Sequence, residues 1–196
     1  MHATERRTNA RMIPVKFVVA GGFGVGKTTF VGAISEIEPL RTEAAMTSVS
    51  SGVDDLTHVG SKTTTTVAMD FGRITVDETL VMYLFGTPGQ DRFGFMWDDI
   101  CTGALGAVVL IDTRRIDQSF PAIDYFEAKR VPFVVGVNTF EGAPRYPIDE
   151  VRDALGVGEH VPLVECDARV KGTVKTALIT LLESLAAQAR SREVVA

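Results

Sequence analysis

The stretch GGFGVGKT at residues 21–28 decides what this chain folds into and what it holds. Its glycines free the backbone to curl until several N–H groups point inward, which suits the β- and γ-phosphates of a nucleotide. Lys27 adds a mobile positive charge, and the hydroxyl of Thr28 is a ligand type that Mg²⁺ accepts. An ordinary Gly-rich turn would leave this Lys-Thr pair without a reason. The stretch therefore predicts a phosphate-binding loop and a nucleotide ligand.

The flanking segments have the patterns that such a loop requires. Residues 14–20 (PVKFVVA) read as a buried strand, and residues 29–37 carry apolar side chains at helical spacing. The loop thus ends at a helix N-terminus, where backbone N–H groups favour anions.

Further along, strand and helix patterns alternate. The antiparallel partners at 65–76 and 79–85 are joined by a short Asp-Glu turn, whereas the polar residues 40–62 read as a long loop. This order predicts an α/β fold, a doubly wound and mostly parallel six-stranded sheet with one antiparallel strand. The remaining strands are expected at 104–111, 131–137 and 161–164, and the helices at 119–129, 147–155 and 173–190.

Length and composition fit one soluble domain of 196 residues. We expect a disordered tail at 1–12, the domain at 13–190 and a C-terminal tail at 191–196. The net charge of -5 argues against a general nucleic-acid or acidic-membrane surface. No apolar run has membrane-spanning length and no C-terminal cysteine invites prenylation, so we expect a cytoplasmic protein without a direct membrane anchor. Cys101 and Cys166 fit reduced, mostly buried thiols.

Polar residues follow four of the expected strands, at the sheet edge where ligands bind in such folds. They are the phosphate loop, residues 86–90 (GTPGQ), Asn138 and residues 166–169 (CDAR). From about Pro14 to Arg190, the chain with these motifs resembles the Ras-like small GTPases.

The resemblance assigns roles to two further loops. Residues 66–71 (TVAMDF) look like the first switch and its strand, particularly in Rab-type members, which implies that Thr66 touches Mg²⁺ and the γ-phosphate. Residues 88–93 (PGQDRF) resemble the second switch, which implies that the Gly89 N–H senses the γ-phosphate while Gln90 orients the attacking water. Thr65 stays open as an alternative to Thr66, and Gln90 as an ordinary loop glutamine.

Base recognition is implied at two places. Residues 138–141 (NTFE) stand where the family has Asn-Lys-x-Asp, and Ala168 matches the loop whose N–H contacts the guanine oxygen. A carboxylate can accept both guanine donors, N1–H and N2–H₂, whereas the N1 acceptor of adenine would repel it. Glu141 therefore favours guanine, although Asn138 also fits a simple turn cap.

The implied site contains Mg²⁺ with GTP or GDP as the ligand. The expected catalytic residues are Gln90, Lys27 and Thr66, and the expected metal ligands are Thr28 and Thr66. The expected nucleotide contacts are Gly22, Phe23, Gly24, Val25, Gly26, Lys27, Thr28, Thr29, Gly89, Asn138, Thr139, Glu141, Ala168 and Arg169.

The chain departs from the family pattern in informative ways. Gly86 replaces the Asp that holds a Mg²⁺-bound water, Thr139 and Glu141 replace the Lys and Asp of the base motif, and Phe23 stands where a small residue is usual. These traits are similar to bacterial members such as the gliding-polarity GTPase MglA, and most closely to the GTPases of actinobacterial conservons. That resemblance implies three partners, namely a roadblock (LC7)-type protein, a DUF742-type protein and a histidine-kinase-like membrane sensor.

A cluster in the second switch has two readings. Phe93, Phe95, Met96 and Trp97 suit either packing against the sheet or a partner surface that appears with nucleotide exchange. Arg92 fits a structural role better than that of an internal arginine finger, because Rab-type switches carry an arginine there too.

The expected function is a small GTP-binding switch in bacterial signal transduction that hydrolyses GTP slowly, because Phe23 crowds the γ-phosphate and Gly86 weakens Mg²⁺ binding. Two alternatives remain open. One is a nucleotide-loaded scaffold with little hydrolysis, and the other is an ATP-using P-loop enzyme such as a small kinase.

Overall fold

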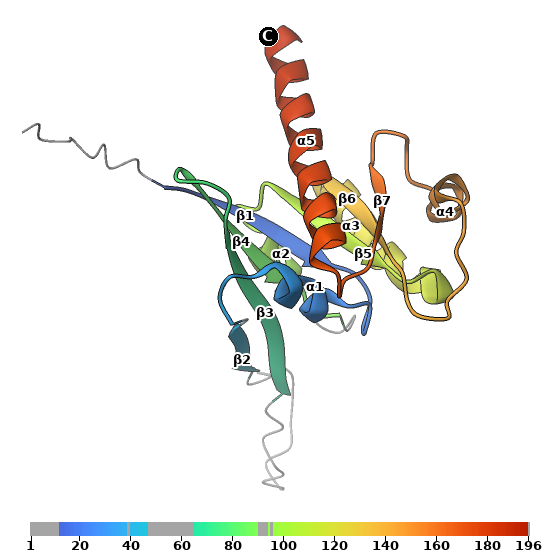
Figure 1. Ribbon diagram of the computed structural model, residues 1–196, viewed down its shortest axis with the longest axis horizontal. Coiled ribbons are helices and arrows are strands. Elements are labelled where there is room, and N and C mark those ends of the chain that lie inside the picture. The colour runs from blue at the N-terminus through green and yellow to red at the C-terminus, as the bar shows by residue number, and fades with distance from the viewer. Residues whose placement is uncertain (1–11, 39, 47–64, 90–93, 95, 196) are drawn as a thin grey trace, which may run out of the picture.

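Seven strands form one sheet, in the spatial order β2-β3-β4-β1-β5-β6-β7 (Figure 1). The computed structural model describes residues 12–38, 40–46, 65–89, 94 and 96–195. The strands are β1 (Ile13–Ala20), β2 (Leu40–Met46), β3 (Thr65–Thr75), β4 (Leu80–Gly86), β5 (Gly106–Ile111), β6 (Phe133–Asn138) and β7 (Leu163–Cys166). The helices are α1 (Lys27–Ile34), α2 (Trp97–Cys101), η2 (Thr113–Ser119), α3 (Phe120–Lys129), α4 (Ile148–Leu155) and α5 (Lys171–Val195).

The sheet is parallel except at β3. β1 pairs in parallel with both β4 and β5, and the parallel pairing continues through β6 to β7. β3 runs antiparallel to both of its neighbours, β2 and β4. The expected α/β fold with one antiparallel strand is confirmed. The sheet is one strand wider than expected, because residues 40–46, which we expected in a loop, pair with β3 from Leu40 opposite Phe71 to Met46 opposite Thr65.

Alternate residues of the central strands face two separate cores. Val18, Val109 and Val135 point to the face covered by α2, α3 and α4. Their neighbours Val19, Val108 and Val134 point to the opposite face, where α1 and α5 pack. Both faces of β1, β5 and β6 are therefore buried, which explains why these strands read as continuous apolar runs.

Helix α5 is longer than the sequence pattern suggested. It runs through Val195, so residues 191–195, expected as a tail, continue the helix. Figure 1 shows its C-terminal turns standing beyond the end of the sheet. Residues 1–11 of the expected N-terminal tail lie outside the described residues. In the described part of the chain, no helix is both long and apolar enough to cross a membrane.

Candidate nucleotide site

The phosphate loop connects β1 to α1 at the carboxyl edge of the sheet. Gly26 caps α1 in a left-handed conformation, with a φ of 103° that favours glycine. A Cβ at this position would also lie 2.8 Å from Nδ2 of Asn138 and 3.3 Å from Cβ of Ala168. Gly26 is therefore required both by its backbone angle and by the close approach of two other loops.

Lys27 is the cation of this loop and lies inside it. Its Nζ donates hydrogen bonds to the carbonyl oxygens of Gly21 and Gly22, both at 2.7 Å. The side chain is 8% exposed. Burial lowers the pKa of the Lys27 amine to about 8, although the nearby Asp70 carboxylate acts in the opposite direction. The charged amine thus donates to neutral carbonyl oxygens, and a negatively charged phosphate group would be a stronger hydrogen-bond acceptor for it.

Gly89 lies against the phosphate loop. A Cβ at Gly89 would lie 2.6 Å from Nζ of Lys27, 2.9 Å from Cα of Phe23 and 3.0 Å from the carbonyl oxygen of Gly22. Only a glycine allows this approach. The backbone of residue 89 therefore lies beside the Lys27 amine.

Asp70 fills the place that Gly86 leaves empty. The Thr28 hydroxyl donates to Oδ2 of Asp70 at 2.6 Å. Phe71 of β3 pairs with Phe85 of β4, so one step further along this antiparallel register Asp70 lies opposite Gly86. A Cβ on Gly86 would lie 3.1 Å from Cβ of Asp70 and 3.2 Å from its Oδ2. The Asp70 carboxylate on β3 therefore lies beside the position that a side chain on residue 86 would occupy.

These oxygen atoms suit a magnesium ion. A hydroxyl and a carboxylate are hard donors, and Mg²⁺ in nucleotide sites takes one or two protein ligands together with phosphate oxygens. Thr28 was among the metal ligands expected from the sequence, whereas Asp70 was not. The signal was available, because Asp70 lies four residues after Thr66 on an expected strand, but its alignment with Gly86 depends on the register between β3 and β4.

Asn138 joins three loops. Its Nδ2 donates to the carbonyl oxygen of Val25 at 2.8 Å, and its Oδ1 accepts from the N–H of Ala168 at 3.0 Å. The side chain is 6% exposed. Both ends of its amide are therefore used inside the protein, and Asn138 holds the phosphate loop against residues 167–169.

The loops at residues 139–141 and 167–169, where base recognition is expected, are more open. The Thr139 N–H donates to the carbonyl oxygen of Cys166 at 2.8 Å, and the Thr139 hydroxyl donates to the same oxygen at 3.5 Å. Asp167 and Arg169 form an ion pair at 2.8 Å, and hydrogen bonds from Arg169 lower the pKa of Asp167 to about 2. Asp167, and more weakly Glu141, raise the pKa of the Arg169 guanidinium. Glu141 thus lies exposed within electrostatic reach of a cation.

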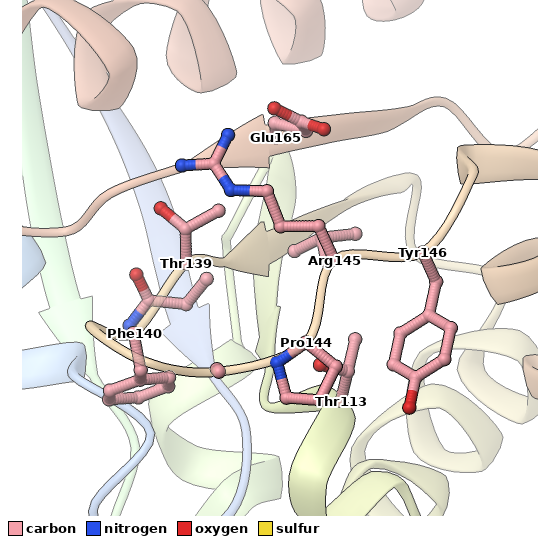
Figure 2. A pocket seen from close by; sticks show the side chains of 10 residues that line it. Thr113, Thr139, Phe140, Pro144, Arg145, Tyr146 and Glu165 are labelled. Carbon is pink, nitrogen blue, oxygen red and sulfur yellow. The ribbon is translucent and has the colours of Figure 1, made fainter.

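Figure 2 shows the residues around a small cavity beneath this loop. Its volume is about 20 Å³, which is room for about one water molecule. Thr139, Phe140, Pro144 and Arg145 come from the segment after β6, and Glu165 comes from β7. This cavity is too small for a nucleobase.

The other expected site residues differ in their positions and in their exposure. Thr66 pairs with Ala45 within the β2-β3 ladder. The Phe23 side chain is 63% exposed, so its ring faces solvent at the mouth of the site. Val25 is buried and Thr29 is exposed. Gln90 lies outside the described residues, as do Arg92, Phe93 and Phe95.

The described part of the aromatic cluster belongs to the core. Trp97 is 9% exposed, and its ring centroid lies 5.2 Å from that of Tyr125 in an edge-on contact. Met96 packs against the same core. For these two residues the packing interpretation is correct.

Comparison with known proteins places this geometry in a family. The chain is 30% identical over 126 residues to uncharacterized protein MJ1339 of Methanocaldococcus jannaschii, covering 63% of this chain and 69% of that protein. It is 28% identical over 191 residues to translation initiation factor IF-2 of Dinoroseobacter shibae, covering 93% of this chain but 20% of the factor.

Solved structures agree on the fold. The cytosolic domain of the T. maritima FeoB iron transporter matches with a TM-score of 0.60 in a GDP form and 0.61 in the apo form. Both matches are 16% identical in sequence and cover 89% and 88% of this chain. The chain spans 64% of each of these FeoB chains. This likeness shows a P-loop NTPase fold of the GTPase type.

The profile of a family described as "Conserved hypothetical ATP binding protein" matches residues 19–188, which include the phosphate loop and Asn138. This chain is therefore a nucleotide-binding P-loop protein and belongs to that family.

Proposed function

We propose that this chain is a small GTP-binding switch that hydrolyses GTP slowly with the help of Mg²⁺. The observation that carries the proposal is the position of Gly89, whose backbone lies beside the Lys27 amine at the phosphate loop. A segment at this point can report whether a γ-phosphate is present, because the phosphate would compete with it for space and offer it a hydrogen-bond acceptor. The GDP form of the similar FeoB fold supports a guanine nucleotide.

Different residues of the chain would bind the phosphates, bind Mg²⁺ and position the attacking water. Lys27 and the loop N–H groups would hold the β- and γ-phosphates, and Thr28 with Asp70 would hold Mg²⁺, directly or through a water molecule. When bound, Mg²⁺ neutralises charge on the transferred phosphoryl group. Thr66 and Gly89 would order around the γ-phosphate, and Gln90 would orient the attacking water. Thr65 stands where the MglA pattern would suggest an arginine that acts within the same chain, and it offers no charge, so unaided hydrolysis should be slow.

Phosphate release by the purified chain tests the enzyme. We expect slow multiple-turnover hydrolysis of GTP that the Gln90→Leu variant abolishes. Fast hydrolysis by the isolated wild-type chain would contradict the proposal of a slow, partner-dependent switch. Release that is absent from the wild type as well would favour a nucleotide-loaded scaffold.

Trp97 offers a direct test of switching. It is the only tryptophan of the chain and begins α2, just after the second-switch segment. Its fluorescence should differ between complexes with GDP and with a non-hydrolysable GTP analogue. Identical emission in the two complexes, with binding of both confirmed, would argue against a nucleotide-driven change at this segment.

ATP binding is the second candidate. The description of the matched family favours it, and so do Thr139 and Glu141, which depart from the usual guanine-reading residues. Competition between GTP and ATP for the same protein sample separates the two candidates. We expect GTP to bind more tightly, and tighter binding of ATP would overturn the guanine assignment.

We further propose that the switch acts in bacterial signal transduction, close to the MglA-like and conservon branch. Its proposed partners are a roadblock-type protein as regulator or effector, a DUF742-type protein and a histidine-kinase-like sensor that would recruit it to the membrane. Co-purification of the GTP-loaded chain with a roadblock-type protein, and no binding to the GDP-loaded chain, is the expected result. Binding that ignores the nucleotide would oppose it.

A further inference from the structure

Asp112 follows β5 and accepts hydrogen bonds from two consecutive arginines, Arg114 and Arg115. Its side chain is 3% exposed. Oδ1 accepts hydrogen bonds from the backbone N–H of Arg114 at 3.0 Å and from its Nε at 2.9 Å, while Oδ2 accepts from an Arg114 terminal nitrogen at 2.8 Å. These bonds lower the pKa of Asp112, so the buried carboxylate is ionised and requires compensation. The Asp112 carboxylate is thus a buried negative charge that orients the two arginine side chains.

Arg114 is fully committed to this cluster and to the base-reading loop. Its guanidinium makes the two-point contact with Asp112 and lies 4.1 Å from the ring centroid of Phe140. Two-point pairing and stacking on an aromatic ring are both contacts that only a planar guanidinium makes well. Arg114 therefore connects Asp112 to the loop after β6.

Arg115 turns to the phosphate loop instead. One of its terminal nitrogens lies 3.4 Å from the carbonyl oxygen of Phe23 and 3.4 Å from Oδ2 of Asp112. The same nitrogen would lie 3.7 Å from a Cβ on Gly24. Within η2 the backbone departs from helical angles at Arg115, with φ of -143° and ψ of 53°. The guanidinium thus lies beside Phe23 and Gly24 of the phosphate loop, whereas the Lys27 amine contacts the carbonyl oxygens of Gly21 and Gly22.

The contacts of Arg115 are weak compared with those of its neighbour. Both measure 3.4 Å, whereas charge-assisted hydrogen bonds are typically about 2.7–2.9 Å. A guanidinium has five N–H donors, and in the described part of the chain these two long contacts use only one nitrogen. The two arginine side chains are equally exposed, at 42%, so the difference between them lies in their hydrogen bonds. Arg115 therefore has both the freedom and the donors to take an anionic partner.

We propose that Arg115 is a second cation of the nucleotide site, which donates to the γ-phosphate across Phe23 and Gly24 when a nucleoside triphosphate is bound. This inference rests on the proposed nucleotide switch and adds to it a residue that discriminates triphosphate from diphosphate. Asp112 holds the arginine near the loop, and the added charge of the γ-phosphate draws it inward. Lys27 and Arg115 then approach the phosphate chain from different residues of the loop.

The test compares affinities for GDP and for a non-hydrolysable GTP analogue, both with Mg²⁺, among the wild type, Arg115→Ala, Arg115→Lys and Arg114→Ala. Loss of one charged hydrogen bond predicts a roughly tenfold or greater loss of triphosphate affinity in Arg115→Ala, with diphosphate affinity little changed. Arg115→Lys should restore part of the loss because it keeps the charge. Arg114→Ala is the matched control, since it shares Asp112 but points to Phe140.

The outcomes are distinct. An unchanged ratio of the two affinities in Arg115→Ala would overturn the proposal, whether both affinities fall together, as expected for a structural role through Asp112, or neither changes. An equal change of this ratio in Arg114→Ala would overturn it too, because the effect would then belong to the cluster. A wild-type chain that bound no nucleotide would instead remove the proposed function on which this inference rests.

Discussion

The two ends of the candidate nucleotide site differ in how tightly their residues are packed. At the phosphate end, Gly26, Lys27 and Gly89 lie within contact distances that leave no room for other side chains. At the base end, Glu141 and Arg169 are exposed, and Thr139 turns away toward β7. Phosphate geometry is common to all nucleotides and demands a rigid backbone, whereas a base is read by a few side chains that can differ. The contrast teaches that the structure constrains phosphate binding more closely than it constrains which base is bound.

Removal of the Lys27 amine should have the largest effect on the phosphate end. Lys27→Ala loses the charge that would face the β- and γ-phosphates, so nucleotide affinity should fall on the order of 100-fold for GTP and ATP alike. Equilibrium binding of fluorescent nucleotides measures it. Lys175→Ala, an exposed change on α5, is the control and should bind normally. A loss confined to one base would show that the two ends are not independent.

Asp70→Asn should weaken the metal dependence of binding. Substitutions around a metal site typically cost about 10- to 100-fold in metal affinity, so the Mg²⁺ concentration that gives half-maximal nucleotide binding should rise by that factor. Asp149→Asn on the exposed face of α4 should leave it unchanged.

A swap sharpens this test. Asp70→Gly combined with Gly86→Asp returns the carboxylate to the strand where Ras-like proteins carry it, and should recover part of the Mg²⁺ dependence lost in Asp70→Gly alone. Normal Mg²⁺ dependence of Asp70→Asn would remove Asp70 from the proposed metal site.

Nucleotide affinity should fall as the pH rises through about 8. Burial lowers the pKa of Lys27 to about 8, and the charged amine is the form that binds phosphate. Below this pH the amine is already protonated and affinity is constant. Above it the protein must take up a proton on binding, so affinity falls by up to about tenfold per pH unit. Calorimetry in buffers of different ionisation enthalpy would detect that proton, and Lys27→Ala should not show it.

The smallest effect is expected at the base end. Glu141→Asp shortens the side chain to the length usual in Ras-like proteins and should raise the preference for GTP over ATP about fivefold, the worth of about one net hydrogen bond. The ratio of the two dissociation constants measures it. Glu141→Gln should lower the same ratio. A shift of Glu141→Asp toward ATP would show that Glu141 does not read guanine.

Local patterns predicted most of the fold. The strands with continuous apolar runs and the helices with clear periodicity lie within a few residues of their expected ranges. β2 was missed because its sequence, LRTEAAM, has no strong apolar alternation, and its ladder with β3 is a contact between distant segments. The extension of α5 was missed because its last turns stand beyond the sheet and need no apolar face.

In the candidate site too, residues within local motifs were predicted, and residues that depend on long-range contacts were not. Lys27, Gly89 and Asn138 were predicted from motifs whose members are neighbours in sequence, and the structure brings them together. Asp70 and Arg115 were missed because their importance depends on contacts across 42 and 92 positions of sequence, Asp70 with Thr28 and Arg115 with Phe23. Such contacts follow from strand order and register rather than from local composition.

The location of Asp70 has a mechanical consequence. In the Ras-like pattern the metal-site carboxylate ends the strand that leads into the second switch, which here is Gly86 at the end of β4. In this chain the carboxylate lies on β3, four residues after Thr66 at the start of the same strand, and β3 has β2 as its outer neighbour. Under the proposed magnesium site, β3 therefore carries both a ligand of the metal and Thr66 of the first switch. A partner that pulled on the β2 edge would loosen both at once.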